Sequence, residues 1–143
     1  MCSSDLSAAA GGLLAVAWRA TCDVPTVPLS LTRFAAVAAL IGATEELLFR
    51  GVVQGRLRSL SPATAVLAAA LLHTAYKLSL FATPAPGELV NLRVLLTCTL
   101  AGGVAFGAVR QVSGSVWPCV AAHAAFDILG YGDCTAAPTW VWN

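Results

Sequence analysis

The chain has 143 residues, of which 58% are hydrophobic and only 10% are charged, and its mean hydropathy is +0.79. A soluble domain would carry roughly 25% charged residues. The net charge of +1 and the lack of any Lys/Arg-rich run argue against nucleic-acid binding. The long Ala/Leu-rich runs do not alternate as the strands of an outer-membrane barrel do, so the composition predicts an integral membrane protein made of helices.

The amino-terminal part predicts one short apolar segment followed by a loop. Residues 6–20 are apolar and form either a partial membrane span or the stub of one. Residues 21–30 contain Pro25 and Pro28, which favour a loop. The start lacks the basic region of a signal peptide, and it leaves open whether the chain is a fragment.

Four longer helices are expected to follow. Ser61 as an N-cap and Pro62 at the first helical position begin the second of them. Gly103 and Gly107 in the third are spaced for close helix approach in lipid. The sequence therefore predicts an all-α, polytopic transmembrane bundle with about four core helices and a short amino-terminal segment. The expected core helices cover about 31–60, 62–81, 89–112 and 115–129.

The first core helix has charged residues where a membrane-spanning helix is deepest. Glu45 and Glu46 lie about 20 Å from its basic end at about 1.5 Å per residue. An ionisable residue at that depth is costly and indicates a functional site. Glu46 and Arg50 are four residues apart and are expected to pair on one face. Glu45 points to another face and is left for a different role.

Two histidines are expected at a similar depth on other helices. Counted from the same side, His73 lies about 16 Å deep and His123 about 12 Å deep. A single buried histidine is more often a packing residue, but polar groups of three helices in one layer predict convergence on one cavity. Asp127, four residues after His123, either orients that ring or shares a metal with it. Lys77 is interpreted as a helix-end residue whose ammonium snorkels to the interface.

These groups suit the activation of water. A carboxylate and a neutral histidine can hold and deprotonate a water molecule, and a second histidine can stabilise an oxyanion. Hydrolysis of a peptide bond is one hypothesis, and binding of a peptide without catalysis is a second. An ion-coupled transporter is a third possibility, which the missing inverted repeat disfavours. A purely structural network of buried ion pairs is the simplest competing explanation of the charges.

Three motifs resemble those of the CPBP family of intramembrane metalloproteases. Residues 45–51, E-E-L-L-F-R-G, resemble its E-E-x-x-x-R motif. His73 resembles the histidine of the following helix, and His123 with Asp127 resembles the motif H-x-x-x-N/D. The family includes the type II CAAX prenyl endopeptidases and the bacteriocin-processing or immunity (Abi) proteins. The resemblance covers about 34–129, with the motifs in the family's order.

The resemblance implies that Glu45 and His73 activate the water and that Arg50 supports the motif helix. It leaves the cofactor open between a divalent metal such as zinc and none. Asp127 stands where many members have asparagine, so it is expected to turn toward His123 and hold that ring. Ala69 replaces the phenylalanine of the histidine motif, which predicts a wider pocket. The implied catalytic residues are Glu45, Glu46, His73, His123 and Asp127, and the implied metal ligands are Glu45, His73, His123 and Asp127.

The resemblance also implies partners and a location. The expected partners are a peptide or protein substrate, lipidated or not, and the lipid bilayer. The expected location is the bacterial plasma membrane. The protease core would occupy 31–130, between an amino-terminal segment at 1–30 and a tail at 131–143. A member that confers bacteriocin immunity by binding a peptide, without catalysis, is the alternative function.

Overall fold

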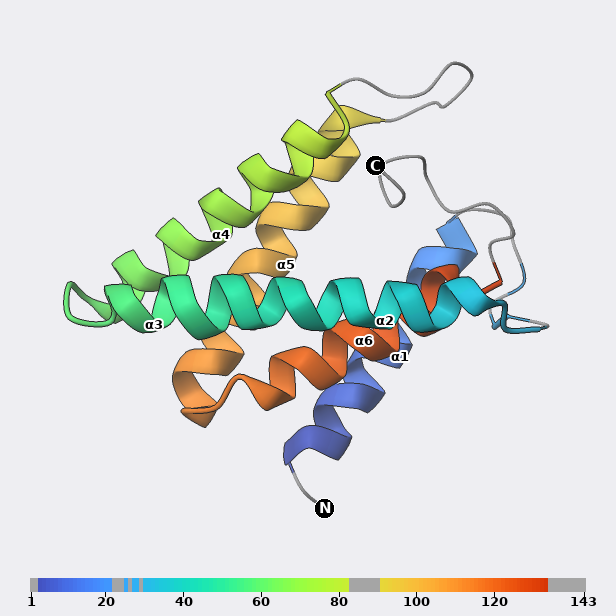
Figure 1. Ribbon diagram of the computed structural model, residues 1–143, viewed down its shortest axis with the longest axis horizontal. Helices are drawn as coiled ribbons and strands as arrows, with labels where there is room; N and C mark the ends of the chain where they lie inside the picture. Colours follow the sequence, from blue (N-terminus) through green and yellow to red (C-terminus); the bar gives the residue numbers. More distant parts are fainter. Residues whose placement is uncertain (1–2, 22–24, 26, 29, 83–90, 134–143) are drawn as a thin grey trace.

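The computed structural model describes residues 3–21, 25, 27–28, 30–82 and 91–133. All regular structure in these residues is helical, which confirms the predicted all-α class (Figure 1). The elements are α1 (Ser3–Thr21), α2 (Arg33–Glu46), the π-helical segment η1 (Leu47–Val53), α3 (Gln54–Leu57), α4 (Pro62–Leu80), α5 (Leu92–Ser113) and α6 (Trp117–Tyr131).

One long helical rod made of α2, η1 and α3 crosses the molecule, and α4 packs with α5 while α1 packs with α6 (Figure 1). The rod begins after Thr32, whose hydroxyl accepts a hydrogen bond from the Phe34 backbone N–H. The expected single α-helix at 31–60 was wrong in one respect. Its middle is π-helical over Leu47–Val53, and such segments are frequent at functional sites.

The other helix ends follow their capping residues. Ser61 caps α4 by accepting from the Thr64 backbone N–H, as its sequence predicts. Gly114 ends α5 with a φ of 69°, a left-handed conformation that favours glycine. The last helix begins two residues later than expected, at Trp117. The expected start of the third core helix at 89 and the tail from 134 lie outside the described residues.

Two glycines of α5 bring this helix close to α4. On α5, a Cβ added to Gly103 would lie 2.9 Å from the Ala70 Cβ, and one added to Gly107 would lie 2.8 Å from Val66 Cγ1. The close approach predicted for this glycine pair is therefore confirmed, and its partner is α4.

The distribution of polarity is inverted relative to a soluble protein. The largest fully buried side chains include Arg50, Gln54 and Glu46, whereas Leu40 on the same rod is 67% exposed. This is the arrangement expected of helices in lipid, where charged groups face the bundle interior. Two helices, α4 and α5, are long and apolar enough to cross a membrane by length and composition. That four core helices span the bilayer stays a prediction.

The buried Arg19 links the end of α1 to the end of α6 by hydrogen bonds. Arg19 is 2% exposed, and its Nη1 and Nη2 donate to the two carboxylate oxygens of Asp133 at 2.8 and 2.7 Å. Its Nη1 also donates to the Gly130 carbonyl at 3.2 Å. The Thr32 backbone N–H donates to the Gly132 carbonyl at 2.7 Å, so the start of α2 joins the same cluster.

The Asp133→Asn variant is expected to melt at a lower temperature than the wild type at neutral pH. The hydrogen bonds from Arg19 lower the pKa of Asp133 below its ordinary value of 3.8. A lowered folded-state pKa stabilises the protein above the ordinary value, and this stabilisation is lost as the pH falls through the folded value. The difference in melting temperature should therefore be full near neutral pH and disappear in strong acid. An equal difference at both ends of a pH series of melting curves would contradict this role.

Candidate active site

The motif residues of four elements meet inside the helical assembly. Glu45 and Glu46 end α2, Arg50 lies in η1, and His73 and His123 come from α4 and α6. The two imidazole centroids are 6.3 Å apart. Their similar depth along the helices predicted that these groups would converge, and the structure brings them together. Every member of the set is buried, and its members are Glu45, Glu46, Arg50, His73, His123 and Asp127.

The Arg50 guanidinium organises one side of this cluster. Its Nη1 lies 2.9 Å from Glu46 Oε1, and neither side chain is exposed, which confirms the pair predicted from the four-residue spacing. The same Nη1 lies 3.1 Å from His73 Nδ1. Because a guanidinium can only donate, Nδ1 accepts, and the proton of a neutral His73 ring is on Nε2. Arg50 thus fixes the tautomer of His73.

Glu45 contacts two groups of α4, a hydrogen-bonded imidazole and an ion-paired ammonium. His73 Nε2 lies 3.0 Å from Glu45 Oε2, and Lys77 Nζ lies 2.5 Å from Glu45 Oε1. The interpretation of Lys77 as a snorkelling residue was wrong, because its side chain is only 17% exposed and ends inside the cluster. The signal in the sequence was its position four residues after His73, which places both on one face of α4.

His123 is held by Glu46 and not by Asp127. Its Nδ1 lies 2.8 Å from Glu46 Oε1, whereas its Nε2 is 3.8 Å from Asp127 Oδ2, beyond hydrogen-bond distance. The expectation that Asp127 orients this ring was therefore wrong. His123 Nε2 is also 3.9 Å from Glu45 Oε2, so it faces the space between two carboxylates.

Aromatic rings and a small thiol enclose the cluster. The Phe49 ring lies 4.7 Å from the His73 ring, and the Phe106 ring lies 5.5 Å from the His123 ring, measured between centroids. Cys119 is fully buried, and its thiol donates to the Phe106 carbonyl at 3.2 Å. Ala69 is buried one turn before His73. That the alanine widens the pocket stays a prediction.

The absence of a side chain at Gly42 leaves space for the side chains of Asp127 and His123. A Cβ there would lie 2.5 Å from Asp127 Oδ2 and 3.1 Å from His123 Cδ2. Sequence reasoning missed this residue, since one glycine in an Ala-rich helix has no distinguishing pattern. Its position one turn before Glu45 and Glu46 was the only available hint.

If the site hydrolyses peptides as its motifs predict, the Gly42→Ala variant should fold and lose about tenfold or more in kcat/KM, since misplacing a reacting group by about 1 Å can cost about 100-fold. The added methyl must displace the Asp127 carboxylate and press on the His123 ring. Peptide hydrolysis by the purified variant is the measurement. Gly55→Ala is the matched control, because a Cβ there meets nothing within 4 Å. Equal losses in both variants would show that the effect is not local to the site.

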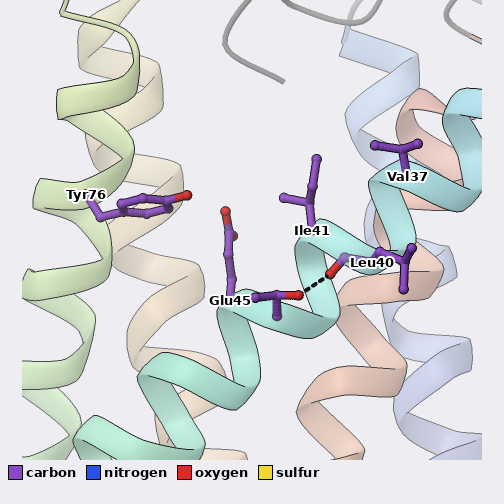
Figure 2. A pocket seen from close by; sticks show the side chains of 6 residues that line it. Val37, Leu40, Ile41, Glu45 and Tyr76 are labelled. Atoms are coloured by element: carbon purple, nitrogen blue, oxygen red, sulfur yellow. Dashed lines mark hydrogen bonds between the residues drawn. The ribbon is translucent and has the colours of Figure 1, made fainter. Parts of the chain in front are cut away.

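A pocket of about 250 Å³ reaches Glu45 from one side (Figure 2). Figure 2 shows the Glu45 side chain between Tyr76 of α4 and Ile41 of α2. Apolar side chains of α2 form the rest of the wall, and the lining residues are Val37, Leu40, Ile41, Thr44, Glu45 and Tyr76. The pocket is therefore mostly apolar and has one carboxylate at its inner side.

The predicted metal ligands do not fit a metal ion. Within the described residues, no group of three or more His, Cys, Asp and Glu side chains is arranged to hold one. In the tautomer set by Arg50, His73 Nε2 carries a proton and has no lone pair for a metal. The Lys77 ammonium already lies against Glu45 Oε1. The positive charges beside Glu45 and Glu46 are therefore those of Lys77 and Arg50.

Comparison with known proteins agrees with the three motifs. A family model described as type II CAAX prenyl endopeptidase Rce1-like matches residues 27–129. Searches of curated proteins and of solved structures gave no match. The matched range contains α2, α4, α5 and every residue of the buried cluster. The chain therefore belongs to the Rce1-like family of type II CAAX prenyl endopeptidases.

Proposed function

We propose that the protein is a membrane-embedded endopeptidase in which Glu45 is the general base that activates water. One observation carries this proposal: a buried carboxylate that lines an apolar pocket accepts from His73 and forms an ion pair with Lys77. The hydrogen bond from His73 and the positive charge of Lys77 both favour the ionised form of the Glu45 carboxylate. A general base must be ionised before it can take a proton. The membership of a protease family supports the reaction class.

In the proposed reaction, the attacking water lies between Glu45 Oε2 and His123 Nε2, which are 3.9 Å apart. Glu45 takes one proton from the water as the oxygen attacks the carbonyl carbon of the peptide bond. Glu45 then passes this proton to the leaving nitrogen as the C–N bond breaks. The products are a new carboxyl terminus and a new amino terminus, so no other reactant is required.

His123 is the proposed donor to the oxyanion. Its Nδ1 donates to Glu46 Oε1, so its Nε2 can donate as well only when the ring carries both protons. Glu46 and Asp127 flank the ring and favour that imidazolium. A preorganised donor of this kind is worth about 10²- to 10³-fold in kcat. Glu46 and Arg50 act by orienting the two histidines.

The proposed location is a lipid bilayer, with the helices forming a polytopic bundle. Buried charges, outward-facing leucines and two helices of spanning length support this proposal. The pocket would then receive its substrate from within one leaflet. The bacterial plasma membrane is an expectation that rests on the family resemblance.

The test is hydrolysis of a peptide library by the purified protein in lipid nanodiscs, in water enriched with heavy oxygen. Mass spectrometry should find one heavy oxygen in each newly formed carboxyl terminus. Gly102→Ala, where a Cβ meets nothing within 4 Å, should cleave the same peptides at the same rate. Peptides that bind without being cleaved would overturn the peptidase and favour the immunity function.

Chelation is expected to leave the rate of hydrolysis unchanged, because Lys77 and the His73 proton occupy the positions that a metal would need on Glu45. The measurement is turnover before and after exhaustive chelation, with the zinc content determined in parallel. Activity that is lost on chelation and restored by stoichiometric zinc would contradict the metal-free assignment.

A further inference from the structure

Lys77 belongs to none of the three motifs, yet its ammonium lies within the buried cluster. It is on α4, one turn after His73, and its Nζ is 2.5 Å from Glu45 Oε1. The two groups that bind the two oxygens of Glu45 therefore come from one face of one helix. A carboxylate held at both oxygens cannot rotate freely about its terminal bond.

We propose that Lys77 is a positioning residue for the proposed base: its ammonium holds Glu45 Oε1, so that Oε2 remains directed at His73 and at the attacking water. This inference rests on the proposed function and deepens it. It also assigns to Lys77 the charge that a metal ion supplies in many peptidases.

The charges around Glu45 explain why this ammonium is needed. From the rod, Glu46 is a second carboxylate, and the Arg50 guanidinium is bound to Glu46 and His73. From α6, Asp127 adds a third carboxylate beside His123. From α4, His73 is a neutral donor in the tautomer that Arg50 sets. The Lys77 ammonium forms an ion pair with Glu45 directly.

The first test compares Lys77→Met, which keeps the length of the side chain and removes its charge, with Lys77→Arg. In the peptide assay, Lys77→Met should lower kcat by about 10²-fold, the cost of misplacing a reacting group by about 1 Å, and should leave KM nearly unchanged. Lys77→Arg should recover most of the loss. Arg58→Met removes an exposed positive charge at the end of the rod and should match the wild type.

Chemical rescue separates a positioning role from a structural one. Propylammonium ions should restore kcat of Lys77→Ala in a saturable manner, because a free cation can occupy the site beside Glu45. The melting temperature should not follow this recovery. A kcat of Lys77→Met within about threefold of the wild type, or a loss confined to KM, would overturn the role of Lys77 while the proposed function stands.

A spectroscopic readout keeps the inference testable without turnover. Subtracting the infrared spectrum of Glu45→Gln from that of the wild type isolates the Glu45 band. Lys77→Met should change the splitting between the symmetric and antisymmetric carboxylate stretches of Glu45, because Oε1 loses its ammonium partner. An unchanged band would overturn the positioning role. A wild type that cleaves no peptide would overturn the proposed function separately.

Discussion

Replacing Glu45 with glutamine is expected to lower kcat by about 10²- to 10⁴-fold, the contribution of a general base. The amide has the volume of the carboxylate, but it cannot take a proton at neutral pH. Its NH2 group replaces one of the two carboxylate oxygens, so a donor must face either His73 Nε2 or the Lys77 ammonium. Lys77, whose side chain is 17% exposed, can turn toward the pocket, so the fold should survive.

Turnover and binding need to be measured on the same preparation of Glu45→Gln. The variant should bind the substrate peptide with an affinity close to that of the wild type, because the pocket walls are unchanged. Its melting temperature should fall by no more than a few degrees, which corresponds to about 1 kcal/mol for a domain of this size. A variant that keeps full biological activity would show that the protein works by binding and not by hydrolysis.

Local geometry made part of this cluster predictable from the sequence. The pairing of Glu46 with Arg50 depends only on helix periodicity, and the salt bridge forms although the segment after Glu46 is π-helical. The convergence of His73 with the carboxylates was predictable because the rise per residue of a helix is constant. Counting residues from the turn that joins the two helices therefore gives the depth of each group. The family motifs added the order of the three helices.

Rotation of the helices about their axes made the rest unpredictable. Depth places His123 beside both Glu46 and Asp127, but it does not say which carboxylate the ring contacts, and Glu46 is the one. The stem of Lys77 is long enough to reach either the interface or Glu45, and the neighbouring carboxylate decides between them. Nothing in the sequence of Leu47–Val53 marks a π-helix, so packing around the motif must stabilise it.

Replacing Arg50 with methionine is expected to cost about 3–5 kcal/mol of stability, as removal of one partner from a buried ion pair does. Neither Arg50 nor Glu46 is exposed, so no water replaces the guanidinium, and Glu46 keeps His123 as its partner. Such a loss is a large part of the 5–15 kcal/mol that typically stabilises a domain. The variant should therefore be recovered in low yield and melt well below the wild type.

The loss should also be specific to the pair. Arg50 Nε and Nη2 have no hydrogen-bond partner among the described residues, so the cost falls mainly on Glu46 and on the tautomer of His73. Arg50→Met combined with Glu46→Gln removes both charges and should recover much of the stability, but not the activity, since His123 loses its carboxylate partner. Arg56→Met, an exposed change on α3, is the control for loss of one positive charge. If Arg50→Met melts at the temperature of Arg56→Met, the buried pair does not stabilise the fold, and Arg50 acts only through the orientation of His73.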